Sequence, residues 1–148
     1  MPQIRRAQAT WSGDLAGGSG DVKAGTSGTF GPLPITWRAR AEADDTGLTS
    51  PEELLAAAHA SCYAMASSNN LAKAGFKPDS VEVSVAVTAD KTDAGWTVLS
   101  SAITLRARVP GIDEQAFQQA VEGAKAGCPI SRAIAGNVDI TLDAQLVS

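Results

Sequence analysis

The chain has 148 residues, 44% of them hydrophobic, which is enough to build one buried core, and its formal net charge is −4 at pH 7. A chain of this length buries about 70% of its unfolded surface, so we expect a single domain over residues 1–148. Its 12 lysines and arginines form no basic cluster, which argues against a nucleic-acid partner.

The hydropathy of the chain bears on its location. No stretch approaches the roughly 20 apolar residues of a membrane span, and residues 1–6 precede no apolar signal segment. We therefore expect a soluble, cytoplasmic protein with no membrane partner. Stable disulfides are disfavoured in that compartment, so Cys62 and Cys128 indicate catalysis, metal binding or packing rather than a permanent cross-link.

Three short strands are predicted near the N-terminus, over residues 5–11, 22–27 and 35–42. Turn-rich stretches at residues 17–20 and 28–34 separate them. Together they predict an N-terminal β meander. The glycines of the first turn do not open a helix after a strand, so a hairpin fits them better than a nucleotide-binding loop.

A long helix is predicted to begin at Pro51 and to end at about Ala74. Ser50 is a suitable N-cap, proline suits the first helical position, and two glutamates follow at the positive end of the helix dipole. Residues 54–66 are apolar or small on nearly every face. This pattern predicts a helix buried on most sides, with Cys62 in the interior.

The pattern then changes to a period of two residues. Valine occupies every second position from 81 to 87, which predicts a half-buried strand. A turn over residues 90–95 leads into a second alternating strand over residues 96–109. These two segments predict a second β hairpin.

The last third of the chain predicts two helices and a strand. Asp113 precedes a segment whose apolar residues recur at helical spacing up to Gly127, and a short helix should begin at Pro129. Alternation over residues 138–146 predicts a final strand. The predicted class is α+β, with an N-terminal β meander, a long buried central helix, a second β hairpin, further helices and a C-terminal strand.

The two cysteines differ in their predicted surroundings. A reactive thiol needs a pKa below its ordinary value of about 8.5. Cys62 lies beyond the reach of its helix dipole and burial would raise its pKa, so it needs a cationic partner. Cys128 precedes Pro129 at a helix start, where free N–H groups favour a thiolate. Charge alone therefore makes Cys128 a candidate nucleophile.

Two segments resemble those of the OsmC/Ohr family of thiol-dependent peroxidases: PEELLAAAHASC at residues 51–62 and KAGCPIS at residues 125–131. The resemblance extends from residues 11–14 to the last strand, and His59 in AAHA is typical of the OsmC branch. It implies an OsmC/Ohr-like fold and an intertwined homodimer with active sites at the subunit interface. It also implies an antioxidant oxidoreductase of the stress response, with peroxiredoxin-like activity that confers organic hydroperoxide resistance.

The resemblance also implies a role for each site residue. Cys62 would attack an organic hydroperoxide, and Cys128 would convert the resulting sulfenic acid to a disulfide between these redox-active cysteines. The activating cation would be Arg40, with Arg38 on the same face of the expected strand as the alternative. Glu52 would clamp and orient the guanidinium. A dithiol, in the family often a lipoyl group, would regenerate the enzyme, and no cofactor is expected.

Other interpretations of these residues remain open. His59 could pair with Cys62 as in nucleophilic hydrolases, but we favour a hydrogen-bonded core or interface histidine. These two residues and Cys128 lack the fourth ligand and close spacing of a zinc site, so no metal is expected. The alternative function is a non-catalytic redox sensor, or a dimer of the same fold that binds a small apolar ligand.

Apolar side chains suggest a substrate class. The loop over residues 30–34, together with Tyr63, Met65 and Phe76, could line a pocket that favours alkyl or aryl hydroperoxides over hydrogen peroxide. Ordinary core packing is an equal alternative for Met65 and Phe76.

Overall fold

The computed structural model describes residues 1–42 and 47–148. The chain divides into two compact units, Met1–Leu54 and Leu55–Ser148, and each is described by itself. Helices and strands occur in both units, so the predicted α+β class is confirmed. The single domain over residues 1–148 stays a prediction.

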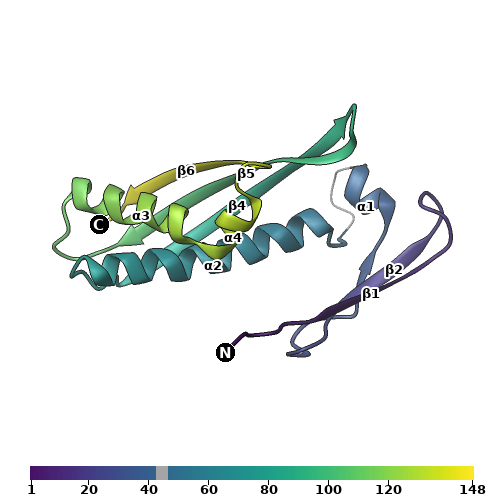
Figure 1. Ribbon diagram of the computed structural model, residues 1–148, viewed down its shortest axis with the longest axis horizontal. Helices are drawn as coiled ribbons and strands as arrows, with labels where there is room; N and C mark the ends of the chain where they lie inside the picture. The colour runs from purple at the N-terminus through teal and green to yellow at the C-terminus, as the bar shows by residue number, and fades with distance from the viewer. Residues whose placement is uncertain (43–46) are drawn as a thin grey trace. The chain divides into compact units, whose positions relative to one another are not determined.

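Three antiparallel strands form the sheet of the first unit, in the order β1 (Ala7–Ser12), β2 (Ser19–Ala24), β3 (Leu33–Ile35) (Figure 1). The predicted meander is confirmed, but β2 begins and ends three residues earlier than expected. Gly20 lies in this strand opposite Trp11, and the position requires glycine because a side chain there would collide with the carbonyl oxygen of Thr10 on β1. The glycines that indicated a turn are therefore partly strand residues.

The third predicted strand is wrong beyond its first residue, because Trp37–Ala41 form a short helix, α1. Thr36 caps this helix, its Oγ1 accepting a backbone N–H at 3.1 Å. Alanine and arginine also favour helix over strand. Arg38 and Arg40 therefore lie on a helix, where residues two apart point to different sides, and not on one face of a strand.

The long helix α2 (Pro51–Lys73) has close to its predicted limits, and Ser50 Oγ accepts the Glu53 N–H at 3.1 Å, which confirms the N-cap. In the single chain, α2 is fully buried along one side only, and burial of its other sides, expected in a homodimer, stays a prediction. Cys62 is half-buried rather than interior, and Met65 is 68% exposed. The fully buried residues of α2 form one stripe at four-residue spacing: His59, Tyr63, Ser67 and Leu71.

A second sheet lies in the second unit. Its central strand β5 (Gly95–Arg108) is antiparallel to β4 (Ser80–Thr92) and parallel to β6 (Asp139–Leu146). The predicted alternation is confirmed, because the valines of β4 are half-buried while their neighbours are exposed. The predicted hairpin closes where Thr92 pairs with Gly95.

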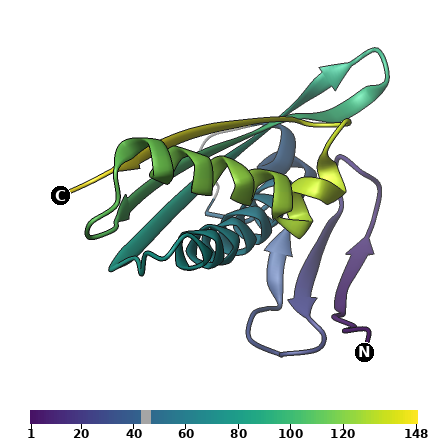
Figure 2. The same ribbon diagram turned by 60° about the vertical axis from the view of Figure 1, so that its left-hand side comes forward.

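Two further helices complete this unit, α3 (Glu114–Gly127) and α4 (Pro129–Ile134), and both confirm predictions. Asp113 caps α3 by accepting a backbone N–H at 2.8 Å. Figure 1 and Figure 2 show α2 and α3 on the same face of the sheet. The core between them includes Tyr63, Leu71, Ile103, Leu105, Phe117 and Val121. No helix within residues 1–42 and 47–148 is long and apolar enough to cross a membrane.

Candidate active site

The two cysteines meet in the second unit although they are 66 positions apart in the chain. Cys62 lies midway along α2, Cys128 lies between α3 and α4, and their Sγ atoms are 3.2 Å apart. Both are free thiols. A disulfide bond measures about 2.05 Å, so a modest approach of the two sulfur atoms would join them.

Cys128 owes its position to the break between two helices. Pro129 cannot supply the N–H that would continue α3, so Cys128 ends that helix and begins α4. The side chain is fully buried, and burial raises the pKa of its thiol, but nearby hydrogen-bonding groups of Ser131, Cys62 and Ile130 outweigh burial and lower the pKa. These groups lower the pKa although the Cys128 side chain forms no capping hydrogen bond at the start of α4.

For Cys62, the effects that raise the pKa of the thiol outweigh those that lower it. Burial raises the pKa of its thiol, the Ile130 N–H opposes this effect, and the adjacent Cys128 raises the pKa further. Within the second unit the thiolate is therefore favoured on Cys128, in agreement with the electrostatic prediction from the sequence. Attack on a peroxide by Cys62 still requires a cation.

His59 is buried one helical turn before Cys62. Its Nδ1 lies 2.7 Å from Ser101 Oγ on β5, and its Nε2 lies 2.7 Å from Ser131 Oγ on α4. Burial lowers the pKa of the imidazole, which is therefore neutral at pH 7. The hydrogen-bonded core histidine favoured from the sequence is confirmed, since serines occupy both ring nitrogens. The part of the chain that the structure describes gathers no three His, Cys, Asp or Glu residues able to hold a metal.

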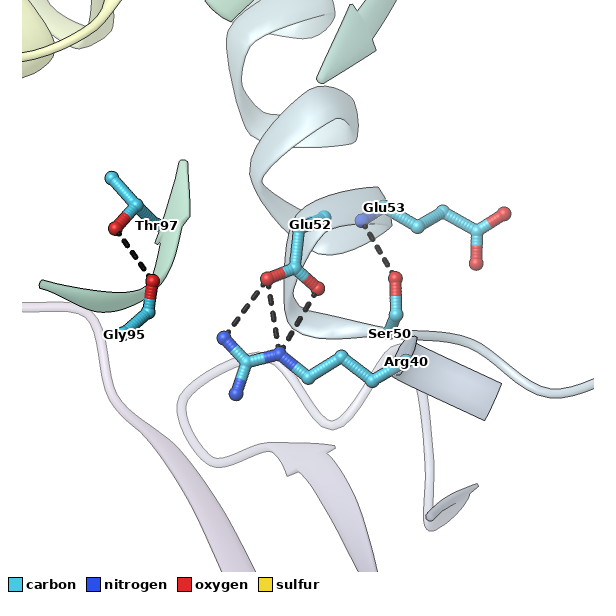
Figure 3. Close-up of polar contacts among 6 residues, drawn as sticks. All are labelled: Arg40, Ser50, Glu52, Glu53, Gly95 and Thr97. Carbon is cyan, nitrogen blue, oxygen red and sulfur yellow. Dashed lines mark hydrogen bonds and ion pairs between the residues drawn. The ribbon is translucent and has the colours of Figure 1, made fainter. Parts of the chain in front are cut away.

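Arg40 and Glu52 form a two-point ion pair in the first unit (Figure 3). The Nε of Arg40 donates to Oε1 at 3.0 Å and to Oε2 at 3.3 Å, and its Nη2 donates to Oε1 at 2.9 Å. The guanidinium also lies 5.9 Å from the centre of the Trp37 ring. Arg38 pairs instead with Glu42 on the surface. Of the two candidate arginines, the structure therefore brings Arg40 to Glu52.

A pocket of about 280 Å³ lies beside Arg40 in the first unit. Its lining is mostly apolar and comprises Trp11, Leu15, Ile35, Thr36, Trp37, Arg40 and Pro51. The predicted pocket role of Tyr63 is wrong, because this side chain is fully buried in the core and its hydroxyl donates to the Val121 carbonyl at 2.8 Å. Phe76 packs against the same core, which favours the core alternative for it.

Three functional candidates were missed from the sequence. Ser101 carries no local signal, because only the fold brings it to the imidazole of His59. Ser131 stands in the KAGCPIS segment, so its proximity to Cys128 in sequence was a usable signal. Trp11 opens the segment over which the resemblance begins, but nothing local assigns it to a pocket.

An α+β fold with two cysteines at this distance defines a two-cysteine thiol protein. A family model described as OsmC-like protein matches residues 43–143. Peroxiredoxin OsmC of Escherichia coli (strain K12) is 41% identical over 144 residues, which cover 97% of each chain. The chain belongs to the OsmC family, as the sequence resemblance implied.

Two further comparisons support this assignment. An organic hydroperoxide resistance protein of Xanthomonas axonopodis pv. citri is 35% identical over 95 residues, or 64% of this chain and 65% of the relative. A crystal structure of an organic hydroperoxide resistance protein OsmC from Legionella pneumophila has a TM-score of 0.68 at 25% identity, and the match covers 97% of this chain and 99% of that chain. The predicted OsmC/Ohr-like fold is thereby confirmed.

Proposed function

We propose that this protein is a thiol-dependent peroxidase that reduces organic hydroperoxides to alcohols in oxidative and osmotic stress defence. The observation that carries the proposal is the 3.2 Å separation of the Cys62 and Cys128 sulfur atoms in a member of the OsmC family. The names of the relatives, a peroxiredoxin and an organic hydroperoxide resistance protein, support the peroxidase activity.

The first step oxidises Cys62. Its thiolate attacks the distal oxygen of the hydroperoxide, so that a sulfur–oxygen bond forms and the oxygen–oxygen bond breaks. The alkoxide that leaves takes a proton and becomes the alcohol. Two electrons pass from the sulfur to the peroxide, and Cys62 becomes a sulfenic acid.

Arg40 supplies the positive charge for this step. A cation near the sulfur lowers the pKa of the thiol, and a donor near the departing oxygen stabilises the developing alkoxide. Glu52 contributes orientation rather than charge, because a carboxylate beside a thiolate would by itself raise the thiol pKa. Its two-point contact with Arg40 fixes the plane of the guanidinium, and the Trp37 ring supports the same group.

The second step forms the disulfide. The Cys128 thiolate attacks the sulfur of the Cys62 sulfenic acid, the sulfur–sulfur bond forms, and hydroxide leaves and takes a proton to become water. The lowered pKa of Cys128 suits an attacking thiol. A dithiol, which we propose to be a lipoyl group, then reduces the disulfide by exchange and restores both thiols.

The substrate class follows from the pocket beside Arg40. Trp11, Leu15 and Trp37 offer apolar contact to an alkyl or aryl group, while Arg40 offers hydrogen bonds to the peroxide oxygens. Hydrogen peroxide has no group that such walls would bind. We therefore propose that bulky organic hydroperoxides are preferred over hydrogen peroxide.

We extend the proposal to a homodimer in the cytoplasm. The homodimer is typical of the fold. Met65 on α2 is 68% exposed, and a second subunit that covered it would remove apolar surface from water. The two free thiols suit a reducing compartment. The oligomeric state can be measured by sedimentation of the reduced protein.

Steady-state turnover tests the proposed activity. The reduced protein is mixed with cumene hydroperoxide and an excess of dihydrolipoamide, and alcohol formed per chain is counted, with Cys62→Ser as the control. We expect many equivalents of alcohol per chain from the wild type and none above background from the control. A protein that consumes one equivalent and stops is a redox sensor, and this result would contradict the proposal.

A further inference from the structure

The turn between β1 and β2 holds the indole ring of Trp11 in one place. The ring Nε1 donates to the backbone carbonyl oxygens of Gly13 at 3.1 Å and of Asp14 at 3.3 Å. Asp14 also closes the turn, because its Oδ1 accepts the Gly17 N–H at 2.7 Å and its carbonyl oxygen accepts the Gly18 N–H at 2.9 Å. The indole is therefore tied to a turn whose shape depends on Asp14.

Two glycines leave room for this ring. A Cβ atom added to Gly18 would lie 2.8 Å from Nε1 of Trp11, and one added to Gly20 would lie 3.0 Å from its Cε3. Nε1 belongs to the five-membered ring and Cε3 to the six-membered ring, so the indole extends over both glycines. Gly20 is also the direct partner of Trp11 in the sheet. The missing side chains let the indole lie close against the backbone.

The rest of the indole faces the pocket beside Arg40. Trp11 is 41% exposed although its Nε1 is hydrogen-bonded and its ring lies over the two glycines. Both Trp11 and Arg40 line this pocket of about 280 Å³. A flat aromatic surface and a cationic hydrogen-bond donor in one pocket fit a ligand that is planar and apolar at one end and carries oxygen at the other.

We infer that Trp11 is a fixed aromatic platform that favours aryl hydroperoxides over saturated ones of the same size, and that Asp14 is a positioning residue that acts through Trp11. The inference rests on the proposed function, because it names the substrate class of the pocket beside Arg40. Two aromatic rings attract each other beyond the burial of their apolar area, whereas a saturated ring lacks this contribution. A platform that is fixed before binding also loses little freedom when the substrate arrives.

Two hydroperoxides with one carbon skeleton isolate the effect of aromaticity. Cumene hydroperoxide carries a phenyl group, and its ring-saturated analogue carries cyclohexyl in the same place. Burial of apolar area alone gives phenyl no advantage, because the cyclohexyl group has the larger apolar surface. We expect the wild type to have a kcat/KM about fivefold higher for cumene hydroperoxide.

The two product alcohols measure binding apart from chemistry. Cumyl alcohol and its ring-saturated analogue are titrated into the reduced protein, and the indole N–H signals of Trp11 and Trp37 are followed by NMR. Both tryptophans line the pocket, and substitution of each assigns its signal among the three tryptophans of the chain. We expect cumyl alcohol to bind about fivefold more tightly than its analogue.

Four variants separate the platform from the stability of the hairpin. Trp11→Leu keeps an apolar side chain without an aromatic face and should lose the preference for phenyl. Asp14→Ala removes the acceptor of the Gly17 N–H, so the Trp11 signal should shift and the preference should fall. Asp14→Asn keeps an acceptor oxygen and should restore both. Thr10→Val is the matched control, because it removes the 3.0 Å hydrogen bond to Asp21 from the same hairpin, and Thr10 points to the opposite face of β1 from Trp11. Circular dichroism checks that each variant is folded.

The outcomes distinguish the platform from the peroxidase activity. Equal binding of the two alcohols by the wild type, or an unchanged preference in Trp11→Leu, would overturn the inference and leave the proposed function intact. Equal losses of preference in Thr10→Val and Asp14→Ala would overturn the positioning role of Asp14. Selective binding of cumyl alcohol by a protein that turns over neither hydroperoxide would overturn the proposed function and support the platform.

Discussion

Arg40 donates hydrogen bonds to both carboxylate oxygens of Glu52, whereas Arg38, two residues earlier on the same short helix, pairs with Glu42 on the surface. The Arg40 and Glu52 side chains are 32% and 11% exposed, so their pairing is less screened by solvent than the surface pair. This difference separates the arginine preferred from the family resemblance from its alternative. It also provides a matched pair of variants.

Arg40→Ala should lower the rate of Cys62 oxidation by cumene hydroperoxide about a hundredfold, because the developing alkoxide loses its charged donor. Arg40→Lys should recover only part of the rate, since an ammonium cannot make the two-point contact with Glu52. Stopped-flow measurement of single-turnover oxidation gives these rates. Arg38→Ala is the control and should react like the wild type. Equal losses in Arg38→Ala and Arg40→Ala would contradict the assignment.

The pocket in the first unit predicts a change in substrate preference. Trp11→Ala should raise the KM for cumene hydroperoxide about tenfold and leave the rate with hydrogen peroxide nearly unchanged, because only the organic substrate contacts the apolar walls. Phe30→Ala, in a loop that does not line this pocket, serves as the comparison and should keep the wild-type preference. The prediction fails if Trp11→Ala affects both peroxides alike.

Thiolate titration should identify Cys128 as the more acidic cysteine. Ultraviolet absorbance against pH should show a first thiolate below the ordinary cysteine pKa, and this transition should be lost in Cys128→Ser. Folding lowers the pKa of Cys128, so its thiolate stabilises the folded state at pH values above the unfolded pKa. This contribution to the free energy of unfolding is lost as the pH falls through the folded pKa. A first transition that survives in Cys128→Ser would place the thiolate on Cys62 instead.

Tyr63 should act in stability and not in catalysis. Burial raises the pKa of its hydroxyl to about 12, so the group stays protonated and keeps its hydrogen bond to the Val121 carbonyl. Tyr63→Phe should lower the free energy of unfolding by about 1 kcal/mol, as judged by urea denaturation. The rate of Cys62 oxidation should not change. A large loss of peroxidase activity in a stable Tyr63→Phe protein would show that this side chain has a further role.

Most of the fold could be predicted from the sequence because its signals are local. Ser50 and Pro51 mark the start of α2, and the period-two valines mark β4. The strand predicted over residues 35–42 is wrong beyond its first residue, because the hydroxyl of Thr36 caps a short helix there. Which faces of α2 are buried could not be predicted, because an alanine-rich helix is compatible with both exposed and buried faces.

The candidate site was predictable only in part. The meeting of Cys62 and Cys128, across 66 positions, came from the family resemblance and has no local signal. The pairing of Arg40 with Glu52 came from the same source. The serines that bind His59 arrive from a strand and a helix far along the chain, so tertiary packing alone brings them together.

The identity of the oxidised cysteine shows whether Cys62 is the residue that attacks the peroxide. Reduced wild type and Cys128→Ser are each mixed with one equivalent of cumene hydroperoxide, the remaining thiols are alkylated, and the intact masses are read. We expect the wild type to lose both thiols as an intrachain disulfide and the variant to stop at oxidised Cys62. If both thiols stay alkylatable in the wild type, or if Cys62→Ser still consumes peroxide at the wild-type rate, Cys62 is not the residue that attacks the peroxide.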